Sequence, residues 1–288
     1  NGDHYGEARA AVAWSNTVAG PYTYVRSFRP FGYMSRDSTL FLDDDGKGYF
    51  ISSSDENATT RFYRLTPDFL DVEEMIGAQF VNQYRESPAV FKRNGVYFFV
   101  SSTTTGWAPN QQKYAYSSSL SSGWSGLSNL GDFWGFASQT AFVLPVQSST
   151  GSTSYLYMGD RWAGAWNRSV NVGSGYVWSP INFPTNTSMS MDWNNTLTID
   201  LTRSNPVQGF TKKFRLRNKK SNQYLDVAGA SQSDGASIIE WPLKSTNNQL
   251  WDLEYKGHGD FYITSQNSGK VVDVPGWSGY AGAALDQW

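Results

Sequence analysis

Three segments of the chain share one pattern, in which a polar residue stands directly ahead of a run of apolar residues. Asp37 precedes the run in "SRDSTLF", Glu86 does so in "RESPAVF", and Gln139 does so in "ASQTAF". A turn and an aromatic-rich segment follow each run, and the spacings from Asp37 to Glu86 and from Glu86 to Gln139 are 49 and 53 residues. The pattern indicates a structural repeat of about fifty residues.

Repeats of this length, built from several short strands, are typical of a β-propeller, in which four-stranded blades surround a central channel. Each unit also contains a further predicted strand, in "ARAAVAWS", "RFYRLTPDF" and "KYAYSSSL". The first of these, at residues 8–15, precedes any recognisable innermost strand, so we expect the chain to enter the first blade partway through. No long segment has the period of an amphipathic helix, and the sequence predicts an all-β protein.

The three polar residues are expected to converge. If Asp37, Glu86 and Gln139 begin the innermost strands of successive blades, their side chains meet at one end of the channel. Convergent polar groups in a concave site are what a catalytic or binding pocket requires. The alternative is that each residue only caps its strand or pairs with a neighbouring arginine, Arg36 or Arg85. Because hydrogen-bonding groups occupy all three equivalent positions, we favour the catalytic interpretation.

A second, different repeat begins after a linker at residues 202–208. Residues 214–241 match residues 261–288 at an offset of 47 residues, and the matched positions include aspartate, valine, glycine, serine and tryptophan. Self-similarity at a fixed offset is the signature of a repeated structural unit. The sequence therefore predicts two domains, residues 1–207 and residues 208–288.

Composition restricts the classes of protein that fit. The chain has 288 residues, 39% of them hydrophobic, and its formal net charge of −2 gives no electrostatic reason to expect nucleic acid or an anionic membrane as partner. No apolar stretch approaches the ~20 residues that span a bilayer, and cysteine is absent. We expect a monomer that uses no metal ion and no other cofactor.

The expected location is extracellular. The first residues, "NGDHYGEARA", do not have the form of a signal peptide, so we expect the chain to begin as a mature or truncated sequence. N-x-[ST] triplets, the acceptor pattern for N-glycosylation, favour export and a secreted glycoprotein. Four such triplets occur, at Asn57, Asn167, Asn186 and Asn194.

The second repeat resembles the ricin-type β-trefoil, the family 13 carbohydrate-binding module, on "DGASIIEW", "NQLW" and the segment around Asp226. That fold contains three such units and the chain ends inside the second, so we expect a partial β-trefoil. The resemblance implies that Asp226 binds sugar, with Asn248 and Gln249 as further polar contacts. For Gln249 and Trp251 we favour a role in the core instead, and the alternative for Asp226 is that it only braces a turn.

Residues 1–207 resemble glycoside hydrolase family 43, and most closely its exo-β-1,3-galactanase branch. The resemblance rests on "SRDSTLFLDDDG", "RESPAVFKRNG", "TTTGWAPNQQ", "ASQTAFVLP" and "YMGDRW". It implies a five-bladed β-propeller, with the first blade incomplete in this chain, and an inverting glycosidase that releases galactose from the ends of β-1,3-galactan, the backbone of arabinogalactan. Glu86 would be its general acid and Asp37 the aspartate that raises the pKa of that acid.

The usual catalytic base of the family is expected ahead of residue 1, and in this branch a glutamine matching Gln139 occupies the site. A neutral amide is a poor proton acceptor but can orient a water or hold the 2-hydroxyl of the sugar, so we assign Gln139 to positioning and leave the base open. His4 and Glu7 have no partner motif and predict no metal site. Further residues expected at the sugar are Tyr5, Thr104, Gly106, Trp107, Asp160 and Arg161, although Asp160 and Arg161 could equally bond one another.

Two other functions remain open on the sequence. The first stays within the same family, as an arabinofuranosidase or xylosidase, against which "TGWAPN" and "SQTAF" argue. The second is a non-catalytic, galactan-binding lectin-like protein in which the propeller is only a scaffold. Retention of both Asp37 and Glu86 argues against the second.

Overall fold

The protein is all-β, as the sequence predicts. The computed structural model describes residues 5–162, 174–210, 213–257 and 260–288, and within these ranges the regular elements are β-strands and single 3-10 turns. The 3-10 turns are Pro30–Gly32, Gly135–Ala137, Ala228–Ala230, Asn247–Gln249 and Pro275–Trp277. In the same ranges, no helix has the length and hydropathy needed to cross a lipid bilayer.

The chain separates into two compact units. The first consists of Asn1–Asp192 together with Ile199–Gln208, and the second of Trp193–Thr198 together with Gly209–Trp288. A short two-stranded sheet occurs where the chain passes from one unit to the other, formed by β14 (Thr196–Ile199) and β15 (Val207–Phe210).

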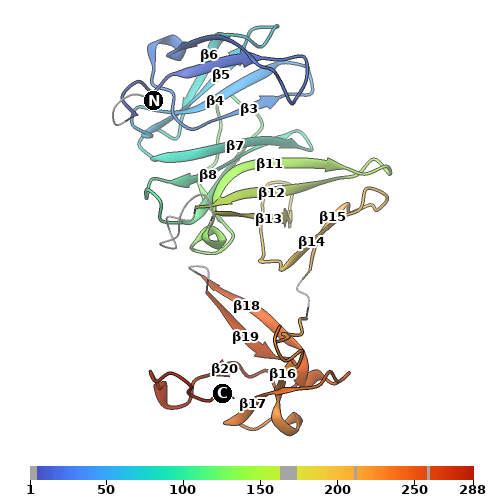
Figure 1. The fold of residues 1–288 in the computed structure, drawn as a ribbon. Coiled ribbons are helices and arrows are strands. Elements are labelled where there is room, and N and C mark those ends of the chain that lie inside the picture. The colour runs from blue at the N-terminus through green and yellow to red at the C-terminus, as the bar shows by residue number, and fades with distance from the viewer. Residues whose placement is uncertain (1–4, 163–173, 211–212, 258–259) are drawn as a thin grey trace. The chain divides into compact units, whose positions relative to one another are not determined.

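Three antiparallel sheets follow one another along the first unit, each in chain order (Figure 1). They are β3 (Ser38–Leu42), β4 (Gly48–Ser54), β5 (Thr59–Leu65) and β6 (Val72–Gln79); then β7 (Arg85–Arg93), β8 (Val96–Thr103), β9 (Gln112–Ser117) and β10 (Ser128–Leu130); then β11 (Gln139–Gln147), β12 (Thr153–Arg161) and β13 (Gly175–Ile181). A two-stranded sheet of β1 (Ala10–Trp14) and β2 (Thr23–Phe28) precedes them. The predicted strands in "ARAAVAWS", "RFYRLTPDF" and "KYAYSSSL" correspond to β1, β5 and β9.

The leading strand of each sheet turns back at a glycine, which confirms the turns predicted from the repeat. Asn94 and Gly95 alone connect β7 to β8, with φ of 49° and 77°. A two-residue hairpin loop of this kind requires positive φ at both positions, which asparagine and glycine tolerate best. Gly46 and Gly151, in the other two turns, have φ of 81° and 87°.

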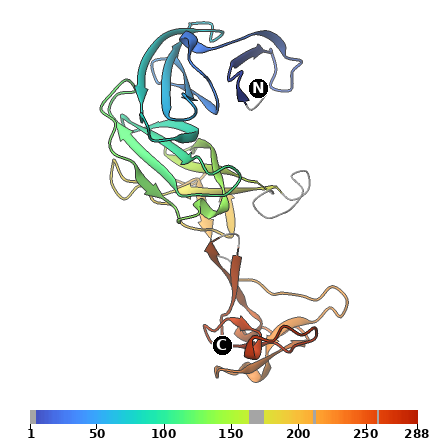
Figure 2. The ribbon, with the colours of Figure 1, turned by 90° about the vertical axis from the view of Figure 1, so that its left-hand side faces the viewer.

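The leading strands β3, β7 and β11 lie side by side, with β7 in contact with both of the others (Figures 1 and 2). Behind them, the sheets of β3–β6 and β7–β10 enclose a core of apolar side chains, each of which contributes about 1.5–3 kcal/mol when fully buried. Because β7 contacts both β3 and β11, the strand starts that carry Asp37, Glu86 and Gln139 lie near one another. The core residues are Ile51, Phe62, Val90, Phe99 and Leu120.

Beyond the β14–β15 pair, the described residues of the second unit form two sheets. One has the order β16 (Tyr224–Val227), β17 (Ala236–Trp241), β21 (Asp286–Gln287) and β20 (Val272–Asp273), and the other pairs β18 (Trp251–Gly257) with β19 (Asp260–Ser265). Gln249 and Trp251 are fully buried, and the indole N–H of Trp251 donates to the carbonyl of Leu225 at 3.1 Å. Both residues therefore belong to the core, as expected from the sequence.

Candidate active site

A cavity of about 520 Å³ lies at the ends of the three leading strands. Asp37 directly precedes β3, Glu86 is the second residue of β7, and Gln139 is the first residue of β11. All three line the cavity, so the structure brings together the polar residues that the repeat pattern singled out. The other lining residues are Tyr5, Ala8, Arg9, Ser35, Arg36, Asn57, Gly106, Trp107 and Trp162.

A bulge in β7 ties the three strands together beside this cavity. The pairing of β7 with β8 shifts between Glu86 and Ala89, and Ser87 within the shift has a φ of 51°. The backbone N–H of Ser87 donates to Asp37 Oδ2 at 3.1 Å, and its hydroxyl donates to the carbonyl of Thr140 on β11. Bulges often re-aim side chains next to active sites. Because the bulge frees Ser87 from pairing with β8, Ser87 can bond to Asp37, next to β3, and to Thr140, on β11.

Glu86 is half-buried, and its pKa is raised above the usual range. Burial is the largest cause because it disfavours the charged form, and the negative charge of Asp37 adds to it. Arg36 and Arg85 oppose the shift. A carboxyl group that keeps its proton closer to neutral pH is suited to act as a general acid.

Replacing Asp37 by asparagine is expected to lower the pKa of Glu86, because it removes a negative charge but keeps an oxygen that can accept the N–H of Ser87. If activity requires protonated Glu86, it falls as pH rises through that pKa. The basic limb of the kcat/KM profile should then move to lower pH in the variant. A pH–rate profile in which this limb stays in place would remove Asp37 from the control of Glu86.

Asn57 also holds Glu86, and sequence reasoning did not single it out for this role. Its side-chain N–H donates to Glu86 Oε1 at 2.7 Å, and the residue is only 4% exposed. This burial corrects the interpretation of Asn57 as a glycosylation acceptor, because its amide faces the cavity acid inside the folded protein. Its Oδ1 has no hydrogen-bond partner among the described residues. The bond from Asn57 favours Oε1 as the carbonyl oxygen of protonated Glu86, and therefore Oε2 as the oxygen that carries the proton.

Replacing Asn57 by alanine is expected to lower kcat about tenfold, the rate equivalent of one hydrogen bond to a carboxyl group. The loss should appear in kcat more than in KM, because the bond orients the acid of the reaction. Steady-state kinetics of Asn57→Ala and Asn57→Ser measure it. An unchanged kcat in both variants would limit Asn57 to a structural role.

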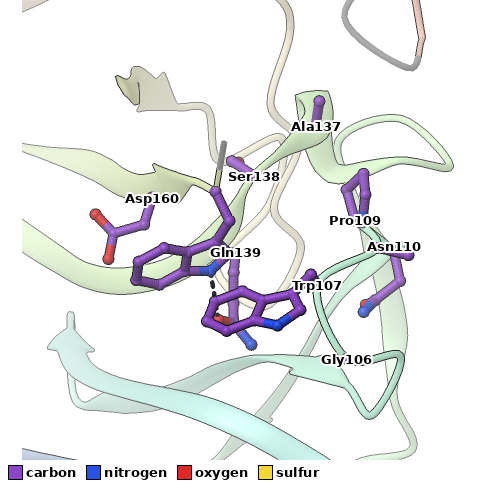
Figure 3. A pocket seen from close by; sticks show the side chains of 10 residues that line it. Gly106, Trp107, Pro109, Asn110, Ala137, Ser138, Gln139 and Asp160 are labelled. Carbon is purple, nitrogen blue, oxygen red and sulfur yellow. Dashed lines mark hydrogen bonds between the residues drawn. The ribbon is translucent and has the colours of Figure 1, made fainter. Parts of the chain in front are cut away.

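The amide of Gln139 is bonded at both ends. Its Nε2 donates to Ser102 Oγ at 3.0 Å, and its Oε1 accepts from Trp162 Nε1 at 3.0 Å, the bond drawn as a dashed line in Figure 3. Trp162 also packs edge-on against Trp107, with 5.7 Å between ring centroids. Trp162 ends the "GDRW" motif, but nothing in the sequence indicated its contact with Gln139.

Tyr5, Gly106 and Trp107, which the sequence predicts as sugar contacts, line the cavity. Trp107 is 59% exposed, so one aromatic surface is open to a ligand. The guanidinium of Arg36 lies 6.0 Å from the centre of the Tyr5 ring. Aromatic rings at a cavity suit the apolar C–H face of a sugar.

Of the other three residues expected to contact the sugar, Asp160 lines a cavity, whereas Thr104 and Arg161 do not. Asp160 pairs with Gln139 across β11 and β12, and it lines a small adjoining cavity of about 10 Å³ that also contains Trp107 (Figure 3). Burial raises the pKa of Asp160. Thr104 is exposed and Arg161 is partly buried, and neither lines the two cavities.

Asp226 and Asn248 of the second unit lie together in its interior. Asp226 is 1% exposed, and its two carboxylate oxygens accept amide N–H groups from Asn248 at 2.9 Å and from Gln249 at 2.8 Å. Asn248 also donates to the carbonyl of Val227 at 3.1 Å. This arrangement favours the alternative in which Asp226 braces the fold.

Within the described ranges, no cluster of three histidine, cysteine, aspartate or glutamate side chains has the geometry to hold a metal ion. His4 and the glycosylation triplet at Asn167 lie outside the described residues. A half-buried carboxyl with a raised pKa, beside a second carboxylate and aromatic rings, has the composition of a site for glycoside hydrolysis.

Comparison with known proteins agrees with this composition. The sequence model of glycosyl hydrolases family 43 matches residues 2–129, and that of the ricin-type beta-trefoil lectin domain-like family matches residues 199–288. None of the curated proteins matches the sequence.

Several solved structures are similar to this chain. An exo-β-1,3-galactanase from Clostridium thermocellum is 39% identical, with coverage of 100% of this chain and 75% of that chain and a TM-score of 0.66. A family 43 β-1,3-galactosidase with galactodeoxynojirimycin is 30% identical over 68% of this chain and 69% of that chain, with a TM-score of 0.63. An exo-β-1,3-galactanase from Phanerochaete chrysosporium with β-1,3-galactotriose is 25% identical over 98% and 74%, with a TM-score of 0.67.

The fold and site define a glycosidase with an appended lectin-type unit. More specifically, the chain belongs to glycosyl hydrolase family 43.

Proposed function

We propose that this protein releases galactose from the ends of β-1,3-galactan, the backbone of arabinogalactan, and that it inverts the anomeric centre. The convergence of Asp37, Glu86 and Gln139 on one cavity carries the proposal. The similarity to exo-β-1,3-galactanases and to a β-1,3-galactosidase supports the choice of substrate.

In the proposed reaction, Glu86 is the general acid and donates the proton on Oε2 to the leaving glycosidic oxygen. Asp37 raises the pKa of Glu86 by like-charge repulsion, and Asn57 orients the carboxyl through Oε1. Gln139 positions the sugar or a water molecule. An inverting mechanism needs a water on the opposite face of the sugar and a base to activate it. No base is assigned to a residue of this chain.

The proposed sugar contacts are in two groups. Tyr5, Gly106 and Trp107 line the main cavity, and Asp160 lines the small cavity beside it. For Thr104 and Arg161, a role in sugar binding is supported only by their sequence motifs.

We propose a five-bladed β-propeller for the catalytic domain at residues 1–207 and a partial β-trefoil for residues 208–288. The succession of sheets led by β3, β7 and β11 supports the propeller, in which β1 and β2 are the strands that this chain contributes to the first blade. The match to the ricin-type family supports the trefoil and a role for the second unit in holding the polysaccharide.

The remaining proposals concern the molecule as a whole. We propose a secreted monomer, with Asn186 and Asn194 as its accessible glycosylation triplets in the described residues. Asn186 is exposed and Asn194 partly buried, which supports this choice over the buried Asn57.

The test is incubation of the full chain with β-1,3-galactan, with proton magnetic resonance to identify the anomer released. Galactose should appear first as the α-anomer, because inversion converts a β-linkage into an α-product. Release of arabinose or xylose from matching glycosides, without galactose, would favour the other activities of the family. Binding to galactan with no sugar released would favour the lectin-like function.

A further inference from the structure

The hydrogen bond between Trp162 and Gln139 has a direction that chemistry fixes. An indole has one N–H donor and no acceptor nitrogen. The amide atom 3.0 Å from Trp162 Nε1 is therefore the oxygen of Gln139. The amide nitrogen is consequently turned to Ser102 Oγ, 3.0 Å away.

The chain of donors and acceptors extends from Gln139 through Ser102 to the backbone of Glu86, the proposed general acid. Ser102 is fully buried, and its hydroxyl donates to the carbonyl oxygen of Glu86 at 3.4 Å. A backbone carbonyl can only accept. Each group between Trp162 and Glu86 thus has an assigned donor and acceptor, and a reversed Gln139 amide would set two donors against each other at Trp162.

We propose that Trp162 is a positioning residue that holds the Gln139 amide with an N–H, rather than its oxygen, available to the sugar. Nε2 has two N–H groups. One N–H bonds to Ser102. The other has no acceptor among the described residues, and Gln139 lines the cavity. The oxygen is already engaged by Trp162. Gln139 therefore meets an acceptor oxygen of the substrate, a hydroxyl or the ring oxygen, as a donor.

This inference rests on the proposed hydrolysis and makes the role of Gln139 more specific. To hold an attacking water through its amide oxygen, Gln139 would have to accept a hydrogen bond from that water, and this oxygen is already engaged by Trp162. An amide that donates to the substrate instead fixes the position of the sugar relative to Glu86. The base of the reaction is then to be sought elsewhere than at Gln139.

A double-mutant cycle tests whether Trp162 acts through Gln139. Trp162→Phe keeps a ring that can pack edge-on against Trp107 but removes the N–H. In the wild-type background it should lower kcat/KM about tenfold, as expected for one lost hydrogen bond and the freed amide. In a Gln139→Ala background it should lower kcat/KM by no more than about twofold, since its partner is already gone. Equal losses in both backgrounds would overturn the proposal.

Trp124→Phe is the matched control. The indole N–H of Trp124 donates to the carbonyl of Leu120 at 3.2 Å, and its ring packs against the core between two sheets, outside the cavity. This variant should melt at a lower temperature with kcat/KM unchanged. A loss of activity in Trp124→Phe equal to that in Trp162→Phe would assign the effect to general destabilisation and contradict the proposal.

The variant Gln139→Glu tests whether Gln139 acts on the substrate as a hydrogen-bond donor or as an acceptor. At pH values above the pKa of the new carboxyl group, it is ionised and offers only lone pairs. If the substrate needs a donor, Gln139→Glu should lose at least as much kcat/KM as Gln139→Ala in this pH range. Activity near that of the wild type would mean that an acceptor suffices, and would overturn the proposal.

The wild-type assay alone tests the proposed function, so the two can fail separately. The variants are compared on whichever glycoside the wild type hydrolyses. If it hydrolyses none, the proposed function fails, and the same cycle is measured as galactose binding by titration calorimetry. Loss of affinity in Trp162→Phe that disappears in the Gln139→Ala background would still support the positioning role, and equal or no loss in both backgrounds would overturn it.

Discussion

Glu86→Gln is expected to lower kcat on β-1,3-galactan by at least about 10²-fold, because general acid catalysis typically contributes 10²–10⁴-fold. The sugar leaving group of the polymer is a poor one and needs the proton that glutamine cannot supply. An aryl β-galactoside with an acidic phenol needs little protonation, so its rate should fall much less. The ratio of the two losses is the measurement that identifies an acid.

The fold should survive this substitution. The amide oxygen of glutamine can still accept the N–H of Asn57 that now bonds to Glu86 Oε1. The side chain is also only half-buried, so a neutral amide of the same size fits. Melting temperatures of the two proteins should therefore be similar. Near-wild-type turnover of galactan by Glu86→Gln would remove this residue from the role of acid.

The sequence predicted the first two strands of each of the three main sheets, and also β1, β5 and β9, because their signals are local. A turn glycine after each apolar run, as at Gly46 and Gly95, determines where a hairpin closes. The fifty-residue repeat then places Asp37, Glu86 and Gln139 at equivalent strand starts. Once the strands are packed in order, the convergence of these side chains follows from the repeat.

Contacts between strands could not be predicted in this way. Asn57 precedes β5 and reaches Glu86 on another sheet, and its Asn-Ala-Thr triplet indicated a surface site instead. Trp162 reaches Gln139 from the end of β12. The bulge at Ser87 was hidden because a proline two residues after a glutamate does not specify how the ladder is broken. Such side-chain partners depend on the packing of sheets, which a single sequence does not encode in a short motif.

The second unit shows the opposite case, in which a motif was recognised but its geometry was not. The resemblance implied a sugar ligand at Asp226, whereas the structure surrounds that carboxylate with amides. This buried carboxylate stabilises the fold because it accepts hydrogen bonds from two buried amide N–H groups. A buried donor without an acceptor is costly.

Asp226→Ala is expected to destabilise the second unit by about 2–6 kcal/mol. The substitution leaves one N–H of each of the Asn248 and Gln249 amides without its acceptor in the interior, while the same nitrogens keep their bonds to the carbonyls of Val227 and Pro242. Each such loss costs about 1–3 kcal/mol. For a unit of this size, each kcal/mol lowers the melting temperature by about 4–8 °C. Calorimetry of the full chain should therefore show a transition at lower temperature, with hydrolysis of a short oligosaccharide at 25 °C unchanged.

Asp273→Ala is the matched control, because Asp273 is the aligned residue of the repeat and is partly exposed. It should lower the melting temperature less than Asp226→Ala does. If the Asp226→Ala protein melts like the wild type but adsorbs less to galactan below the transition, the carboxylate is a sugar ligand and its bracing role is contradicted.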